Sequence, residues 1–235
     1  MTTVRLPAPA RWHTWAFGAA LAVLAAMGWG WSLQIAETGH HGLPLWGRVL
    51  MWTTMMVGMM VPPEVPTLVR LARDRWREVG AAAALLGGYL VVWAVASVGL
   101  ALLDARLGAW GLMSHEMASR SVALNVAILA GAGLMQLSPW KSACLERCRS
   151  ISRDVRGGSF ASGLRHGLAS VSSCGVLMLV LFVVGAMSWA AMLVLTGLLV
   201  AERVAPAVVS PLLSRVTGVG LLGWAAWLSV NAGLH

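Results

Sequence analysis

Sulfur-containing side chains at helical spacing are the residues of this sequence best suited to specific chemistry. Five of the ten residues from 51 to 60 are methionines, and on a helix they form two adjacent stripes. The stripes are Met51, Met55 and Met59 beside Met56 and Met60. Thioether sulfur is a soft ligand that prefers Cu(I) to hard ions, so the stripes predict a copper path or resting site. The alternative is packing, because methionine fills irregular gaps between helices well.

The segment Cys144-Leu-Glu-Arg-Cys148 is a second candidate metal site. Its two thiols lie at i and i+4, one above the other if the segment is helical. Arg147 and Arg149 favour the thiolate, which is the metal-binding and nucleophilic form. Two thiolates at this spacing can hold Cu(I) near-linearly or share it with a third ligand. The alternative is a pair of reduced cytoplasmic thiols on an interfacial helix.

Cys174 and His166 are further candidate ligands on the same grounds. Each has a plainer interpretation, Cys174 as a small buried hydrophobic residue and His166 as an interfacial side chain. Three cysteines do not complete a disulfide framework. Their spacing also differs from the Cys-x-x-Cys motif of thiol oxidoreductases, which weakens a redox interpretation.

Prolines follow the methionines at positions 62, 63 and 66 and predict a break in that helix. They release the carbonyls of Gly58, Met59 and Pro62 from helical hydrogen bonds. At membrane depth such carbonyls require cover from protein or from a wet cavity. The methionine helix is therefore predicted to be central.

Two carboxylates occur near the ends of predicted spans. Glu64 lies roughly 28 Å from Leu45 along a helix that rises 1.5 Å per residue, which places it near the inner interface. We expect Glu64 to face the arginine-rich loop that follows, and Glu202 to lie at a similar depth. Neither carboxylate is predicted to be part of the metal site.

The composition predicts an integral membrane protein. Of the 235 residues, 58% are hydrophobic and 11% are charged, and 13 tryptophans accompany a single tyrosine. The net charge of +8 is explained by basic loops at the cytoplasmic face, which excludes a nucleic-acid partner. No catalytic triad, phosphate loop or pair of catalytic carboxylates is evident, so no catalytic residues are assigned.

The apolar runs predict an all-α, polytopic transmembrane helix bundle of about seven spans. The spans cover about 15–33, 45 to the basic loop that starts at Arg70, 81–103, 121–137, 167–186, 189–204 and 216–230. This map puts 14 of the 17 basic residues on one side, the other three being Arg48, Arg106 and Arg120. The split favours a cytoplasmic N-terminus, and a six-span version merges the fifth and sixth spans. The chain is then a single domain, 1–235, with a cytoplasmic tail (1–13) and a basic cytoplasmic loop with an interfacial helix (138–165).

Several short motifs follow one another along the chain. They are Met55-Met56-Val-Gly-Met59-Met60-Val-Pro62 and Gln136-Leu-Ser-Pro139-Trp-Lys141-Ser-Ala-Cys144-Leu-Glu-Arg-Cys148-Arg149, then Gly163-Leu-Arg-His166-Gly167, Cys174, Leu177-Met178, Gly185-Ala-Met187 and Glu202-Arg203. In order and spacing they resemble a bacterial family of integral membrane proteins described as predicted metal-binding, a domain of unknown function. The resemblance implies a membrane architecture and metal binding, but no reaction.

One segment departs from the family pattern, which looks like Cys-x-Gly-Cys-Cys-Trp after the His-Gly pair. This chain has Ser170-Val-Ser-Ser173-Cys174-Gly175, so one cysteine of three remains. If that stretch forms a soft-metal cage in relatives, here it holds a single thiol and hydroxyl groups. The departure makes the methionines and the pair Cys144 and Cys148 the stronger candidate metal ligands.

These observations predict a multi-pass protein of the inner (plasma) membrane that binds or moves a soft metal, Cu(I). The methionine stripes form its midplane path, and Cys144, Cys148, Cys174 and His166 form a site on the cytoplasmic side. Expected partners are the bilayer, anionic lipid at the basic loops, and a membrane protein or a second copy of the chain. The alternatives are a metal-free assembly or scaffold subunit and, more weakly, a membrane thiol enzyme.

Overall fold

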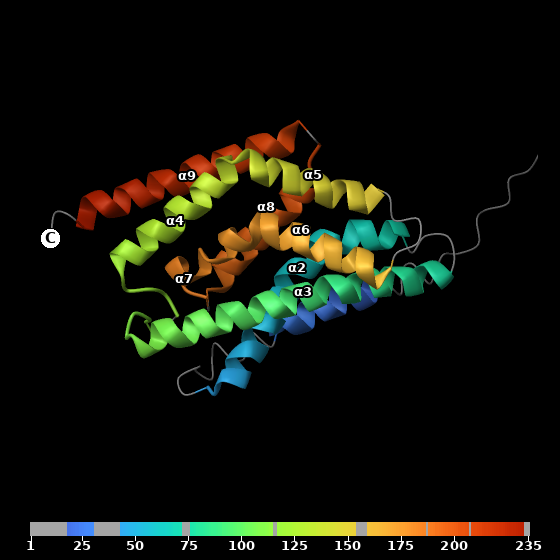
Figure 1. Ribbon diagram of the computed structural model, residues 1–235, viewed down its shortest axis with the longest axis horizontal. Coiled ribbons are helices and arrows are strands. Elements are labelled where there is room, and N and C mark those ends of the chain that lie inside the picture. The colour runs from blue at the N-terminus through green and yellow to red at the C-terminus, as the bar shows by residue number, and fades with distance from the viewer. Residues whose placement is uncertain are drawn as a thin grey trace, which may run out of the picture.

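The computed structural model describes residues 18–30, 43–71, 76–114, 117–153, 159–186, 188–206 and 208–232. Within these ranges the chain is all-α, as predicted (Figure 1). The predicted tail, 1–13, and part of the basic loop, 154–158, lie outside the described residues. The helices are Gly18–Gly30, α2 (Leu45–Leu71), α3 (Trp76–Ala109), α4 (Val122–Leu137), α5 (Pro139–Arg153), α6 (Phe160–Met178), α7 (Leu181–Val184), α8 (Trp189–Val204) and α9 (Val209–Ala232).

The described helices supply fewer membrane spans than the seven predicted. Three segments are long and apolar enough to cross a bilayer: Val79–Ala109, Phe160–Val184 and Val209–Ala232. A fourth is added if α4 and α5, which meet at an angle of 63°, count as one broken span. The helix Gly18–Gly30 and α8, with 16 residues, fall short of the ~20 residues that a span needs. Seven spans are therefore not shown.

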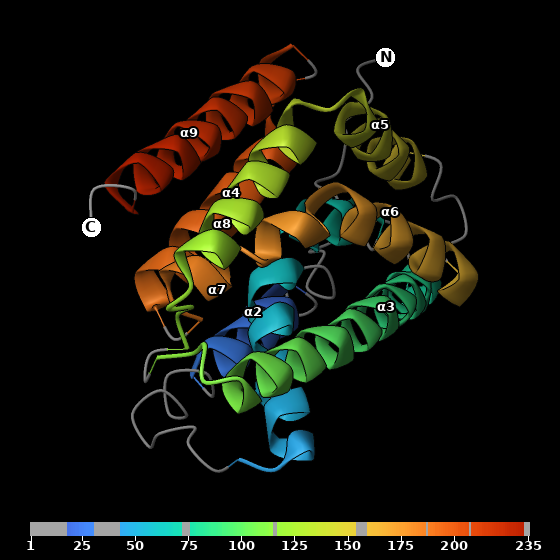
Figure 2. The same ribbon diagram turned by 60° about the vertical axis from the view of Figure 1, so that its left-hand side comes forward.

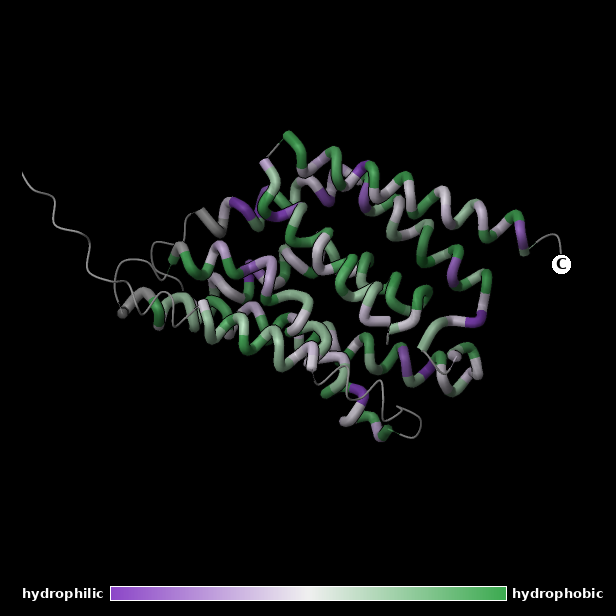
Figure 3. Tube along the Cα trace, turned by 180° about the vertical axis from the view of Figure 1, so that it is seen from behind, coloured by the Kyte–Doolittle hydropathy of each residue, from purple (hydrophilic) through white to green (hydrophobic). Residues whose placement is uncertain are grey.

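The outer surface of the bundle is apolar. Val95 on α3, Val194 on α8 and Val219 on α9 leave 68%, 71% and 62% of their surface exposed. Hydrophobic residues predominate along most of the helices, with hydrophilic ones in short stretches (Figure 3). Such a surface suits contact with lipid better than contact with water.

The helices pack in two pairs around a central group. α4 lies along α9 at one edge, and α3 packs on α6 towards the other (Figures 1 and 2). α2 packs on α3 and α8, which makes the methionine helix central, as predicted. Elements from α2, α3, α6 and α8 therefore meet inside the bundle.

Glycines set the close approach of α3 and α6. A Cβ atom on Gly163 would lie 2.1 Å from the carbonyl oxygen of Leu85, and one on Gly88 would lie 2.2 Å from that of Phe160. Because no side chain fits there, the two backbones touch. The pair Gly87-Gly88 in the sequence of α3 predicts such a close helix contact. His166 follows Gly163 by one turn and is thereby pressed towards α3.

The prolines do not break α2. The helix continues from Leu45 to Leu71 with Pro62, Pro63 and Pro66 inside it, so the predicted break is wrong. The Nε1 of Trp29 donates to the freed carbonyl of Gly58 at 3.0 Å. This bond is the protein cover expected for a released carbonyl, and it compensates part of the cost of the prolines.

Candidate functional site

The five predicted methionine ligands all lie inside the protein. Met51, Met55, Met56, Met59 and Met60 are buried, and none exposes more than 2% of its surface. The stripes therefore face other helices and not lipid. Burial is what both the packing interpretation and the metal path require, so it does not separate the two.

Close to the methionines, Glu64 makes an ion-paired contact with two other helices. Its Oε2 lies 2.7 Å from the Nε2 of His166 on α6, and its Oε1 accepts from the Nη1 of Arg203 on α8. Glu64 is 1% exposed, so the prediction that it faces the arginine-rich loop is wrong. The carboxylate is buried because α6 and α8 supply its partners, as a buried charge requires.

Glu64 also fixes the state of the His166 ring. Arg203 also contacts the Glu64 carboxylate and lies 3.4 Å from the same ring nitrogen, so we take the carboxylate as ionised and assign the proton of the short contact to Nε2 of His166. Its other nitrogen, Nδ1, is buried and has no hydrogen-bond partner among the described residues. A histidine that donates one ring nitrogen to a carboxylate and keeps the other free has the arrangement typical of a metal ligand.

The hydroxyl of Ser170 extends this network along α6. The Nη2 of Arg203 donates to Ser170 Oγ at 2.8 Å, and the Tyr89 hydroxyl lies 3.3 Å from the same atom. Cys174 Sγ donates to the Ser170 carbonyl at 3.0 Å. Because His166, Ser170 and Cys174 follow one another at i, i+4 and i+8, the histidine and the thiol share one face of α6.

None of the three cysteines forms a disulfide within the described residues, and all are buried. Cys144 and Cys148 lie on α5, which is helical as their stacking required. Cys148 lies within electrostatic range of Arg203, Glu64, Cys174 and Cys144. The thiols of α5 and α6 therefore approach the same buried network.

Arg203 of α8 is a cation near the thiols that the sequence did not predict there. It is the strongest positive neighbour of both Cys148 and Cys174. Arg147 is exposed, whereas Arg149 donates to the carbonyls of Glu202 and Ala205 at 3.0 Å. The influence of Arg147 and Arg149 on the thiols stays a prediction, and Arg203 adds a cation from α8.

A second buried ion pair joins α5 to α8 and α9. Lys141 Nζ lies 3.0 and 2.8 Å from the two carboxylate oxygens of Glu202, and Ser214 Oγ donates to Oε1 at 2.9 Å. Lys141 and Glu202 are 1% and 2% exposed, so the interfacial position predicted for Glu202 is wrong as well. This pair holds α5, with its cysteines, against the end of α8.

The described residues do not contain a preformed cage of classical ligands. No group of three His, Cys, Asp or Glu side chains is close enough to hold a metal ion within them. A site here therefore relies on two such ligands, on methionine sulfur, or on movement of the helices. Both thiol and thioether sulfur suit Cu(I).

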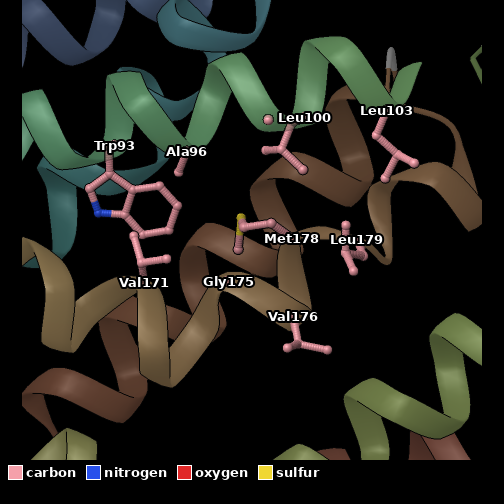
Figure 4. A pocket seen from close by; sticks show the side chains of 10 residues that line it. Trp93, Ala96, Leu100, Leu103, Val171, Gly175, Val176, Met178 and Leu179 are labelled. Carbon is pink, nitrogen blue, oxygen red and sulfur yellow. The ribbon is translucent and has the colours of Figure 1, made fainter. Parts of the chain in front are cut away.

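The apolar groove between α3 and α6 is not part of this site (Figure 4). It has a volume of about 310 Å³, and Met178 supplies the one sulfur among its lining side chains. The other lining residues carry no titratable group; they are Trp93, Ala96, Gly99, Leu100, Leu103, Val171, Gly175, Val176 and Leu179. The apolar lining of the groove suits a hydrocarbon group and not a metal ion.

Sequence reasoning overlooked Tyr89, Ser170 and Arg203, and it placed Glu64 outside the site. Two signals were present in the sequence: Tyr89 is the sole tyrosine, and Arg203 belongs to the Glu202-Arg203 pair noted in the family resemblance. Neither signal reveals a partner, because the Glu64–Arg203 pair joins residues 139 positions apart.

One comparison of the chain with known proteins finds a match. Residues 49–228 fit the family model of PpoB2, described as a copper chaperone. The chain belongs to the PpoB2 copper chaperone family. The match runs from α2 to α9 and includes every predicted ligand. Neither the curated proteins nor the solved structures include a significant match. Membership in the PpoB2 family suggests copper handling, and copper chaperones are typically not enzymes.

Proposed function

We propose that this protein is a membrane copper chaperone that binds Cu(I) as its cargo at the junction of α2, α5, α6 and α8. The free, buried Nδ1 of His166 carries the proposal. An unpaired buried nitrogen costs stability unless a ligand satisfies it. A soft cation beside thiols is a ligand that suits the groups around it.

The proposed ligands are His166 Nδ1 and the thiol of Cys148, which movement of the helices would bring together on one ion. Cys174 lies two turns, about 12 Å, beyond His166 along α6, too far to hold the same ion, and it offers a further thiol on the path. Cys144, one turn before Cys148, is a second thiol for receiving or releasing the ion. Binding as thiolates releases protons, so the affinity rises with pH. Glu64 holds the histidine ring and does not contact the metal.

The methionine stripes supply the approach to this site. Met59 and Met60 precede Glu64 by about one turn of α2, whereas Met51 lies about 13 Å away from Met60 along the helix. A row of buried thioethers over this length offers Cu(I) successive weak soft sites. The predicted topology, seven spans with a cytoplasmic N-terminus, would put the thiols towards the cytoplasm. That topology and the inner-membrane location belong to the proposal.

The alternative of a scaffold subunit has one supporting observation. Gly220 and Gly223 on α9 are exposed, and a Cβ atom at either would meet nothing within 4 Å. Small residues on a lipid-facing helix permit close packing of a partner helix. A stable partner that copurifies with metal-free protein would favour this alternative. The thiol-enzyme alternative is weaker, since all three thiols are buried.

The deciding experiment measures Cu(I) binding to detergent-purified protein without oxygen, against a competing chelator. We expect the parent chain to bind about one Cu(I) or more. Replacing both Cys144 and Cys148 by Ser should lower the stoichiometry. His166→Gln should lower the affinity, because Gln keeps an N–H for Glu64 but lacks the Nδ1 ligand.

The matched control is Ser172→Ala, which lies on the exposed side of α6 between the network residues. It should bind copper as the parent does. Unchanged binding in both the double cysteine variant and His166→Gln would disprove the proposed site.

A further inference from the structure

A polar pocket lies between α5 and the start of α9, and none of its lining residues belongs to the His166 network. It has a volume of about 180 Å³. Its lining residues are Lys141, Ser142, Leu145, Glu146, Arg149, Ser210, Pro211 and Ser214. Two cations and three hydroxyl groups therefore surround a space that the copper proposal does not use.

Ser210 is the residue that points to a ligand. It is fully buried, and its Oγ has no hydrogen-bond partner among the described residues. A buried hydroxyl without a partner costs free energy, whereas a bound acceptor would satisfy it. Ser214, one turn further along α9, also lines the pocket, but its hydroxyl already donates to Glu202.

The positive charge of the pocket comes from Arg149. Lys141 is neutralised by the Glu202 carboxylate. The guanidinium of Arg149 instead donates through Nη2 to two main-chain carbonyls, and it forms no salt bridge within the described chain. Glu146, which is exposed, is the opposing charge in the lining. An anion with several oxygen acceptors would match Arg149 and Ser210 together.

The location of α5 indicates where such an anion comes from. α5 turns away from α4 by 63°, and Trp140 at the turn is 59% exposed. An exposed tryptophan beside a basic helix at the end of an apolar helix is typical of the membrane interface. Basic pockets between helices at this level bind lipid head groups.

We propose that this pocket binds the phosphate group of an anionic phospholipid. Arg149 donates to the phosphate from one side and Ser210 from the other, while the acyl chains lie along the apolar surface of the bundle. The proposal does not depend on copper, because no proposed copper ligand lines the pocket. It does connect the lipid to the helix that carries Cys144 and Cys148.

The test measures the thermal stability of delipidated, detergent-purified protein with added phosphatidylglycerol, phosphatidylcholine or inorganic phosphate. A ligand that binds the folded state raises the midpoint, and the shift grows with the logarithm of its affinity at a fixed concentration. We expect phosphatidylglycerol to give the largest shift. Equal shifts from phosphatidylglycerol and phosphatidylcholine would overturn the lipid assignment, as would a shift from inorganic phosphate that matches the shift from phosphatidylglycerol.

Variants of the pocket decide whether the effect is local. Ser210→Ala should bind phosphatidylglycerol about tenfold more weakly, because it loses a hydrogen bond to a charged group. Without lipid it should be as stable as the parent or more so, since the change removes an unsatisfied buried hydroxyl. Glu146→Gln should bind about two- to fivefold more tightly, since it removes a like charge.

Two controls separate the pocket from general attraction to the basic surface. Arg215→Gln removes an exposed charge of α9 outside the pocket and should leave lipid affinity nearly unchanged. Arg149→Gln should weaken binding more than Arg215→Gln does. Equal losses in these two variants, or unaltered affinity in Ser210→Ala, would overturn the proposal.

Discussion

His166 Nε2 lies 2.7 Å from Glu64 Oε2, although 102 residues separate the two in the chain. The contact joins α6 to α2 inside the bundle, and Arg203 from α8 completes it. A carboxylate, a histidine and a guanidinium thereby fix the relative positions of three helices. The same contact leaves His166 Nδ1 available, so the network is both a structural joint and the basis for proposing a copper ligand.

Removing the Glu64 carboxylate should strongly destabilise the protein. In Glu64→Gln, Arg203, whose side chain is 12% exposed, keeps its charge but loses its buried counter-ion. Breaking a buried ion pair in this way costs about 3–5 kcal/mol. Denaturant unfolding in detergent, followed by the loss of helical signal, measures the change.

Asp104→Asn is the matched control for Glu64→Gln. Asp104 is also paired with an arginine, but the side chain of that partner, Arg48, is 22% exposed. Water can therefore solvate Arg48 when the carboxylate is lost, and the cost should be clearly smaller. Equal losses in the two variants would show that burial of Arg203 does not determine the penalty.

Adding a methyl group at Gly163 should separate α3 from α6. In Gly163→Ala the new Cβ would lie 2.1 Å from the Leu85 carbonyl oxygen, so the backbones must move apart. Overpacking of this kind costs about 1–3 kcal/mol. Because His166 is one turn away, Cu(I) affinity should fall as well. Unfolding and chelator competition on the same sample measure both effects.

Gly197→Ala provides the comparison for that change. Gly197 is a glycine of α8 whose Cβ would meet nothing within 4 Å. The substitution should leave copper binding unchanged and raise stability by up to about 1 kcal/mol, because Ala favours the helix. A loss of stability similar to that of Gly163→Ala would contradict the packing argument.

The Trp29–Gly58 hydrogen bond predicts a specific cost for replacing the indole. Trp29→Phe leaves the Gly58 carbonyl, which Pro62 has already freed, without its donor. An unsatisfied carbonyl in this part of the bundle should cost about 1–3 kcal/mol. Trp46→Phe, at a position 71% exposed, should cost much less. The difference between the two midpoints of unfolding isolates the hydrogen bond from the general effect of losing a tryptophan.

The sequence was sufficient for properties that depend on local periodicity. Apolar runs gave the helical class, the spacing of Met51, Met55 and Met59 gave a buried stripe, and Gly88 gave a close helix contact. The sequence did not predict the position of a side chain whose partners lie far away along the chain. Glu64 was placed at an interface because it lies roughly 28 Å along the helix from Leu45, yet its partners come from α6 and α8.

The described helices do not show the predicted count of seven spans, for a related reason. Hydropathy does not distinguish a helix that faces lipid from one that packs inside the bundle. α2 is buried by its neighbours, carries a paired carboxylate and contains three prolines, so its apolar residues serve the core. The residue types of the candidate site were thus visible in the sequence, whereas the network that positions them was not.

Replacing sulfur by carbon in the methionine stripes should separate ligation from packing. A variant with Met55, Met56, Met59 and Met60 all changed to Leu keeps the volume and the apolar character of four fully buried side chains. Volume-conserving exchanges of this kind usually cost less than about 1.5 kcal/mol each, so the variant should still fold. If the thioethers carry Cu(I), the variant should bind fewer ions per chain, or bind them more weakly, while Cys148, Cys174 and His166 remain. Elemental analysis of variant and parent, purified side by side, gives the stoichiometry, and unfolding confirms the fold.

Copper content equal to that of the parent in a folded variant would assign the methionines to packing and confine the site to the thiols and His166.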